Sequence, residues 1–230
     1  MSVAPGPGVG KAPRRPLPRY PHHHWERKLA RQGYCAIAGV DEAGRGSWAG
    51  PLVAAAVVLP RPRPALRRKL AGLRDSKQLS AAQRWRLFDR IESVAIGIGV
   101  GLVAASTIDQ LGLAAAGRLA LAQAAANLAV APDYLLIDAF RLPELDCPQE
   151  AIVHGDALCL SIAAASVIAK VHRDALLSDL ARLYPAFGFE RNKGYGTPEH
   201  HRALEEYGPT PEHRASYAPV RAALELRGLC

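Results

Sequence analysis

The order of short and long apolar segments narrows the fold of this chain more than any other property of its sequence. Three short runs rich in small and β-branched residues come first, followed by a long Ala-rich run, two short runs and a second long run. Short runs bounded by Gly and Pro are typical of strands, whereas long runs are typical of helices. The predicted strands lie at 34–41, 52–60, 94–103, 134–140 and 150–157, and the predicted helices follow Ser80 as an N-cap, begin at Leu111, and cover 161–184.

This order predicts an α/β domain with a mixed sheet. The first three strands can form an antiparallel meander, to which helices would join the strands that begin at 134 and 150. Gly97, Gly99 and Gly101 share one face of the third strand by period 2, which predicts close approach by another backbone. A glycine turn and a short helix opening at Thr197 predict a small helical C-terminal part.

Positive charge is concentrated in two segments. The formal net charge is +8, with seven Lys/Arg and one Glu in residues 1–34 and five Lys/Arg and no acid in residues 61–69. These segments contribute +6 and +5, which leaves −3 for the rest of the chain. Two basic patches on a slightly acidic body suit a polyanionic partner such as nucleic acid. The run 61–69 by itself is equally compatible with a solvated connector and with a contact to duplex backbone.

The remaining composition indicates a cytoplasmic protein. With 230 residues and 49% hydrophobic residues, the chain suits one globular domain, or one domain and a tail. The N-terminal segment has no apolar stretch of the kind found in signal peptides, and the four cysteines are widely spaced. Arg118, Gln123 and Asn127 interrupt the longest apolar run, so we expect no membrane span. We also expect a monomer.

The stretch AGVDEAGRGSWAGP, residues 38–51, places Asp41 and Glu42 just before a Gly-Arg-Gly turn. Adjacent carboxylates repel unless a metal ion, a proton or solvent exposure relieves the repulsion. Asp138 and Asp156 also lie near the ends of predicted strands, where acidic residues can converge on a crevice at the sheet edge. These residues are candidate ligands.

Four carboxylates with no nearby Cys or His set suit a hard cation such as Mg²⁺ or Mn²⁺. Two such ions, roughly 3.5 to 4 Å apart, suit the cleavage of a phosphodiester. Spacing alone does not single out such a site. Asp41 and Glu42 could form a solvated turn, and Asp138 and Asp156 could serve as cap or turn residues.

Six blocks of sequence sharpen this interpretation. They are GVDEAGRGSWAGPLVAAAVVL, DSKQLS, LLIDAF, HGDALCLSIAAASVIAKVHRD, NKGYGTPEHHRAL and GPTPEHRASYAPV. In this order they resemble the motif blocks of the ribonuclease HII family, the type 2 ribonucleases H, from about residue 24 to residue 222. Six ordered blocks are far more specific than one short motif.

The resemblance implies an α/β fold with a ribonuclease H-like mixed sheet flanked by helices and a small helical C-terminal part. Residues 1–22 would form a disordered, basic, Pro/Gly-rich tail, and residues 23–225 the catalytic domain, with no further domain after it. The implied activity is that of a metal-dependent endoribonuclease. It would cut 5′ to a ribonucleotide in RNA/DNA hybrids and at single ribonucleotides in duplex DNA, leaving a 3′-hydroxyl and a 5′-phosphate and serving ribonucleotide removal in DNA repair.

The resemblance also assigns roles to individual residues. The catalytic metal ligands, for two Mn²⁺ or Mg²⁺ ions, would be Asp41, Glu42, Asp138 and Asp156. The turn Gly44, Arg45 and Gly46 would read the 2′-hydroxyl through its backbone, Tyr195 would pack on the following sugar, and Lys77 would meet a phosphate. Lys170 and Arg173 are secondary candidates for phosphate contacts, although Lys170 would lie on the order of 20 Å along a helix from Asp156.

Some positions depart from the family pattern or keep a structural interpretation. The departures are Ser47-Trp48, His154 and Asn192. We expect Asp75 to form a turn or cap, Asp174 to form an ion pair, and the histidine runs 22–24 and 200–201 to be solvated, since adjacent histidines lack the spacing of a helical zinc site. Two alternatives remain: a type 3 ribonuclease H, and a protein that binds hybrids without cutting them.

Overall fold

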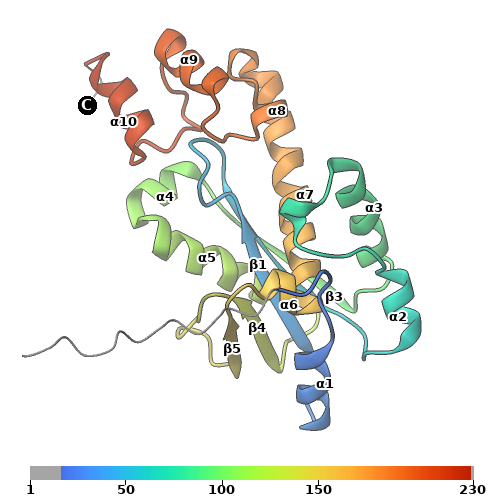
Figure 1. Ribbon diagram of the computed structural model, residues 1–230. Coiled ribbons are helices and arrows are strands. Elements are labelled where there is room, and N and C mark those ends of the chain that lie inside the picture. The colour runs from blue at the N-terminus through green and yellow to red at the C-terminus, as the bar shows by residue number, and fades with distance from the viewer. Residues whose placement is uncertain (1–16, 229–230) are drawn as a thin grey trace, which may run out of the picture.

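Five strands form one mixed sheet in the computed structural model, which describes residues 17–228 (Figure 1). The strand order is β3-β2-β1-β4-β5. The strands are β1 (Ile37–Ala43), β2 (Leu52–Val58), β3 (Gly97–Val103), β4 (Tyr134–Asp138) and β5 (Gln149–Ile152). The predicted mixed sheet is confirmed.

The first three strands form the predicted antiparallel meander, and β4 and β5 extend it in parallel with β1. The chain passes from β3 to β4 through helices, as expected. It passes from β4 to β5 through residues 139–148, which contain no helix, so this part of the expectation was wrong. Leu142 in this segment is fully buried, and its backbone N–H and C=O both bond the side chain of Gln149.

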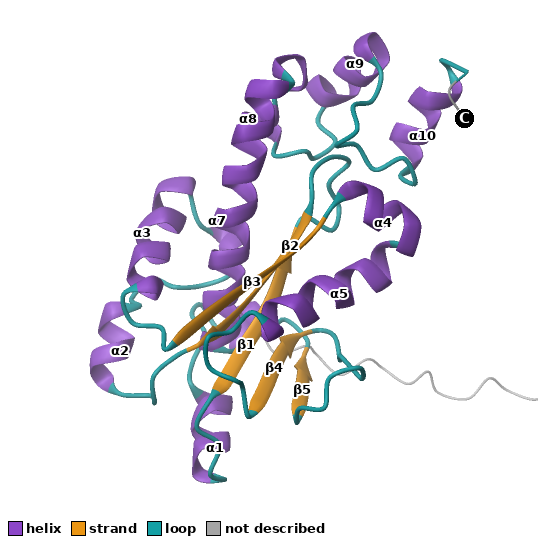
Figure 2. Ribbon diagram, turned by 180° about the vertical axis from the view of Figure 1, so that it is seen from behind, coloured by secondary structure: helices purple, strands orange, loops and turns teal. Residues whose placement is uncertain are grey.

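Helices cover both faces of the sheet (Figure 2). One face packs against α4 (Ala105–Leu111) and α5 (Leu113–Ala126), and the other against α7 (Leu160–Leu183) with α3 (Ala81–Glu92) behind it. Because successive side chains of a strand point to opposite faces, β2 supplies Ala54 and Ala56 to the α5 side and Ala55 and Val57 to the α7 side. This explains why β2 is apolar throughout.

Glycines permit close packing of helices on the sheet. A Cβ on Gly99 or Gly101 would lie 2.1 Å from a backbone oxygen of α5, which confirms the predicted close approach at these two positions. A Cβ on Gly39 of β1 would lie 2.1 Å from the backbone of α7. Gly112, with φ of 77°, separates α4 from α5, so the Ala-rich helix begins two residues later than predicted. The predicted N-cap Ser80 is confirmed, because it forms a capping box with Gln83.

Two side chains of α5 reach the outer edge of β3. Leu102 N donates to Gln123 Oε1 at 3.1 Å, and Asn127 Nδ2 donates to Val100 O at 2.8 Å. Strand β3 has a neighbouring strand on one side only. The amides of α5 therefore satisfy edge groups that no strand pairs.

A small helical part lies beyond the C-terminal end of α7, as predicted (Figure 1). It contains η2 (Pro185–Phe187), α8 (Phe189–Asn192), α9 (Pro198–Tyr207) and α10 (Ala218–Glu225). Phe187, Phe189, Leu204 and Val220 form its core, which also includes Ala49 from the loop between β1 and β2. This contact brings the loop after β1 against the C-terminal part.

The remaining short elements are α1 (His24–Arg31), α2 (Pro64–Lys69), η1 (Ser76–Gln78) and α6 (Gly155–Leu158). Of the tail predicted for residues 1–22, residues 1–16 lie outside the described residues, whereas His22 N donates to Leu158 O at 3.1 Å. Cys35, Cys147 and Cys159 are free thiols, and Cys230 lies outside the described residues. Within residues 17–228, no helix is both long enough and apolar enough to cross a membrane.

Candidate active site

Three aspartates from separate elements converge on one point. They are Asp41 in β1, Asp138 at the end of β4 and Asp156 in α6, and one carboxylate oxygen from each lies within 4.8 Å of the others. Strands β1 and β4 are parallel, with Val40 paired to Ile137, so the residues that follow these two lie side by side. The sheet register thus brings together Asp41 and Asp138, two of the four predicted carboxylates.

Asp156 reaches this point by a turn and a helix rather than by a strand. The predicted strand ending at Gly155-Asp156 was wrong, because β5 ends at Ile152 and α6 begins at Gly155. His154 between them adopts a left-handed conformation with φ of 59°, which ends the extended backbone. Gly155 N then donates to Asp138 Oδ1 at 2.7 Å, and this bond holds the turn against β4.

Glu42 lies outside the group of three. Asp41 pairs with Ala55, which packs on the α7 side of the sheet, whereas Glu42 pairs with Ala54, which packs on the α5 side. Glu42 Oε1 is 3.5 Å from a guanidinium nitrogen of Arg45, and Oε2 is buried without a hydrogen-bond partner. Its role as a metal ligand stays a prediction.

The carboxylates are held in an environment that disfavours their charge. Burial raises the pKa of Asp41 well above its usual value, and Glu42, Asp138 and Asp156 raise it further by repulsion. Burial likewise raises the pKa of Glu42, Asp138 and Asp156. A buried cluster of oxygen ligands that repel one another suits a hard divalent cation, which would restore the charged form of each ligand. The donor set therefore fits Mn²⁺ or Mg²⁺.

Lys77 forms an ion pair with Asp156. Its Nζ lies 3.7 Å from Asp156 Oδ2, and 77% of its side chain is exposed. Burial opposes its charge, but Asp156 and the neighbouring aspartates outweigh burial and raise its pKa. Asp75 accepts a bond from Lys77 N at 2.9 Å, which confirms Asp75 as a cap and fixes the backbone of Lys77. Lys77 is therefore placed to meet an anion beside the aspartates.

The Gly-Arg-Gly turn follows β1 directly. Gly44 has φ of 98°, and a Cβ there would lie 2.1 Å from Arg173 Nε, so only glycine fits. Gly46 is exposed, and a Cβ there would meet no atom within 4 Å. The guanidinium of Arg45 lies 4.7 Å from the centre of the Phe140 ring. Internal packing thus explains the first glycine of the turn but not the second.

Tyr195 lies in a second loop that contacts the first. Its side chain is partly exposed, at 39%. Trp48 N donates to Gly194 O at 2.8 Å, and the Trp48 ring covers Gly196, where a Cβ would lie 2.0 Å from Cζ2. Trp48, one of the departures from the family pattern, therefore joins loop 44–51 to loop 192–197. Ser47 is buried with no partner for its hydroxyl, and nothing in the structure explains its identity.

Two buried arginines bind these loops together. Arg173 donates to Ala49 O, Pro51 O and Lys193 O at 2.9 to 3.1 Å, and burial lowers its pKa to about 10. Arg214 donates to Gly50 O at 2.9 Å and to Arg45 O at 3.1 Å. Both are fully buried, so the suggestion that Arg173 contacts a phosphate was wrong. The two loops and the two arginines form one unit, the loop clamp.

A histidine pair completes the loop clamp. His200 Nδ1 is 3.0 Å from Tyr195 O, and His200 Nε2 is 2.9 Å from His213 Nε2. Because Thr210 N–H donates to His213 Nδ1, His213 must donate from Nε2 to His200, which in turn donates from Nδ1 to Tyr195 O. The expectation of solvated histidines was wrong for His200, which is fully buried, and for His23, which is 7% exposed.

Other predicted residues have structural partners. Asn192 donates to Phe187 O at 2.6 Å and accepts from Gly194 N at 2.8 Å, so this departure shapes the loop of Tyr195. Asp174 pairs with Lys170 at 2.6 Å and with Arg84 at 3.5 Å, which confirms it as an ion-pair residue. Lys170 Nζ also lies 5.6 Å from the centre of the Tyr195 ring.

Comparison with known proteins agrees with the family resemblance of the six sequence blocks. The model of the family described as Ribonuclease HII matches residues 38–220. A curated protein named Ribonuclease HII from Chloroflexus aurantiacus is 52% identical over 202 residues, covering 86% of this chain and 94% of that protein.

Solved structures extend the comparison to the fold. The ribonuclease H2 from Pyrococcus horikoshii OT3 matches with a TM-score of 0.69 and 30% identity, covering 83% of this chain and 97% of that chain. Bst-RNase HIII in complex with Mn²⁺ matches with a TM-score of 0.61 and 21% identity, covering 84% of this chain and 70% of that chain, a likeness in fold alone.

Proposed function

Because this chain belongs to the ribonuclease HII family and is a ribonuclease H, we propose that it hydrolyses the phosphodiester bond 5′ to a ribonucleotide. Its substrates would be RNA/DNA hybrids and duplex DNA with single embedded ribonucleotides, and its products would carry a 3′-hydroxyl and a 5′-phosphate. Such an enzyme serves ribonucleotide removal in the cytoplasm as a monomer. The family match favours this activity over the type 3 alternative.

The convergence of Asp41, Asp138 and Asp156 next to the Gly-Arg-Gly turn carries this proposal. The three aspartates, with Glu42 as a fourth ligand, would hold Mn²⁺ or Mg²⁺. When bound, such ions activate water and neutralise charge on the phosphate. The structure of Bst-RNase HIII with Mn²⁺ supports the choice of metal.

The residues around the cluster would orient the substrate. The exposed backbone at Gly46 lets a ribose approach closely enough for its 2′-hydroxyl, the group that distinguishes RNA from DNA, to be read. Tyr195 would pack against the following deoxyribose, where another hydroxyl would intrude. Lys77, beside Asp156, would bind a phosphate oxygen near the cleaved bond. Cleavage and sugar recognition would thus act within one small region.

A cleavage assay tests this function. The wild-type protein and Asp138→Asn would each receive a DNA duplex with one ribonucleotide, an all-DNA duplex and an RNA/DNA hybrid, with Mn²⁺, with Mg²⁺ or with EDTA. We expect the wild type to cut only the two ribonucleotide-containing substrates, and only with metal. Asp89→Asn on the exposed face of α3 is the matched control and should cut normally.

Two results would contradict the proposal. One is a wild-type protein that leaves the ribonucleotide uncut with both metals. The other is an Asp138→Asn variant that cuts as fast as the wild type.

A further inference from the structure

A groove of about 1150 Å³ runs beside α1 and α2. Its lining includes the cationic side chains of Arg19, Arg27, Lys28, Arg31 and Arg67, and no carboxylate among residues 17–228. We refer to it as the α1–α2 groove. None of the roles assigned to the active site uses these residues.

The α1–α2 groove joins the two basic segments that stand apart in the sequence. Arg27 and Arg31 belong to α1, whereas Arg67 belongs to α2, some distance along the chain. Helices α1 and α2 lie on the same side of the sheet, below α3 and α7 in the view of Figure 1. The fold thereby turns two separate runs of positive charge into one surface, which neither run predicts alone.

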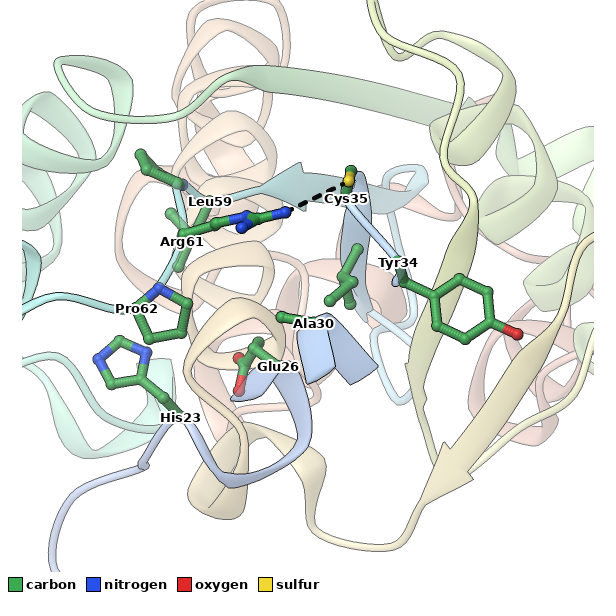
Figure 3. A pocket seen from close by; sticks show the side chains of 10 residues that line it. His23, Glu26, Ala30, Tyr34, Cys35, Leu59, Arg61 and Pro62 are labelled. Atoms are coloured by element: carbon green, nitrogen blue, oxygen red, sulfur yellow. Dashed lines mark hydrogen bonds between the residues drawn. The ribbon is translucent and has the colours of Figure 1, made fainter. Parts of the chain in front are cut away.

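The single acid of the first 34 residues does not offset this charge. Glu26 is only 5% exposed and lies beside a small cavity (Figure 3). Its carboxylate accepts bonds from Ser161 N and Ser161 Oγ, both at 2.9 Å. Its carboxylate therefore stabilises the first turn of α7. The cavity beside Glu26 in Figure 3 is only about 20 Å³, room for about one water. A polyanion can be accommodated in the α1–α2 groove and not in this cavity.

Two lining residues of the α1–α2 groove are close in sequence to residues of the active site. Leu73 lines the groove, and the segment from Leu73 leads within a few residues to Lys77, which contacts Asp156. Leu160, at the start of α7, lines it as well and follows Asp156 by one short helix. We therefore expect a nucleic-acid strand that leaves the active site past Lys77 to reach the positively charged side chains of the groove next.

We propose that the α1–α2 groove binds the phosphate backbone of the nucleic-acid substrate on one side of the cleaved bond. This rests on the proposed function, because it takes the ligand to be a duplex already held at the aspartates. Arginines without carboxylate partners bind phosphates by displacing condensed counterions, which gives affinity without dependence on base sequence. The groove lengthens the footprint on the duplex and leaves the choice of cleavage position to the aspartates and the Gly-Arg-Gly turn.

The test removes one charge from each basic segment. The groove variant is Arg27→Gln with Arg67→Gln, and the matched control is Arg86→Gln with Arg118→Gln, on the exposed faces of α3 and α5. All four arginines are exposed, and within residues 17–228 none of them forms an ion pair. Both double variants lose the same net charge, so long-range attraction to nucleic acid changes equally.

Binding is measured in EDTA by fluorescence anisotropy of a duplex with one ribonucleotide, over a range of salt concentrations. Two lost phosphate contacts should make the slope of log Kd against log salt shallower by about 1.8 and weaken binding roughly tenfold at low salt. Trimming the duplex on one side of the ribonucleotide should weaken binding by the wild type and the control, but not by the groove variant. Trimming the other side should affect all three proteins alike.

Equal slopes and equal dependence on duplex length in the groove variant and the control would overturn the proposal. Cleavage by the wild type with Mn²⁺ is scored separately. A wild type that cuts the ribonucleotide but binds trimmed and full duplexes equally well contradicts only the groove. A wild type that shows the length dependence but never cuts contradicts only the proposed function.

Discussion

The aspartate cluster and the loop clamp are both polar and largely buried, but their polar groups are satisfied in different ways. In the cluster, Asp138 and Asp156 repel Asp41, and beside the cluster Glu42 Oε2 has no hydrogen-bond partner within residues 17–228. In the loop clamp, Arg173, Arg214 and His200 each bond backbone carbonyls or another buried side chain. The region that we propose to receive metal and substrate is thus left with unsatisfied groups by the chain itself. The loop clamp is completed by its own contacts, apart from the buried hydroxyl of Ser47.

Asp41→Asn should produce the largest effect, on activity. We expect cleavage to fall roughly a thousandfold, about 4 kcal/mol of barrier, because the cluster loses a ligand charge. The metal-free protein should unfold at the same or a higher temperature, since one repelling charge is gone and the asparagine oxygen can still accept from Glu42 N. Single-turnover cleavage and thermal unfolding measure the two effects. A variant that unfolds several degrees lower would show that the cluster supports the fold.

Arg214→Met should produce the opposite result, a large loss of stability. It leaves the carbonyl of Gly50 buried without its donors and leaves Arg45 O with the Tyr217 hydroxyl alone, which we expect to cost about 3 kcal/mol of unfolding free energy. Urea unfolding measures this loss. Arg118→Met on exposed α5 is the control and should change stability by less than about 0.5 kcal/mol. If the two substitutions lowered the unfolding free energy equally, the loop clamp would contribute no more to stability than the exposed surface of α5 does.

The histidine pair should give the loop clamp a dependence on pH. Burial lowers the pKa of His213 from 6.5 to about 3, so the unfolded chain binds more protons between these values. The stability contributed by His213 is complete above pH 6.5 and is lost as the pH falls, by about 2 kcal/mol between pH 6.5 and pH 5. The difference in unfolding free energy between the wild type and His213→Gln isolates this effect from the carboxylates. A difference that is constant with pH would contradict it.

Substitutions of the two glycines of the turn should give the smallest effects, one on activity and the other on stability. Gly46→Ala should leave stability unchanged within about 0.5 kcal/mol, because the added Cβ meets nothing. It should lower kcat/KM on an embedded ribonucleotide about tenfold, the equivalent of one hydrogen bond. Gly44→Ala is the contrasting variant and should destabilise the fold, since its Cβ would collide with Arg173. A loss of stability in Gly46→Ala would show that this glycine supports the packing of the loop rather than access to the substrate.

The sequence supports prediction of the sheet better than prediction of the clamp. The meander of the first three strands follows from local apolar patterns, and the expected convergence of Asp41 with Asp138 is explained by the parallel register of β1 and β4, which the structure supplies. Alternation along β1 also indicates that Glu42 faces away from Asp41. The turn at His154 was missed because its left-handed backbone interrupts a strand-like run.

The clamp residues could not be predicted locally. Arg173 and His200 are polar residue types that are usually found on the surface. Only their contacts with the two loops bury them. Long-range contacts of this kind have no periodic signature in the chain. The burial of Glu26 against Ser161 depends on the same kind of contact.

The amides of Gln123 and Asn127 on the outer edge of β3 have a consequence for behaviour at high concentration. An open edge strand offers backbone groups on which a strand of another molecule can add, and Leu102 on this edge is 45% exposed. With Val100 O and Leu102 N already bonded to α5, a second copy finds these two groups occupied. Helix α5 thus packs on one face of the sheet and also protects the edge of β3 against edge-to-edge aggregation. Substitutions of Gln123 or Asn127 would therefore lower the solubility of the protein more than they would lower the stability of its fold.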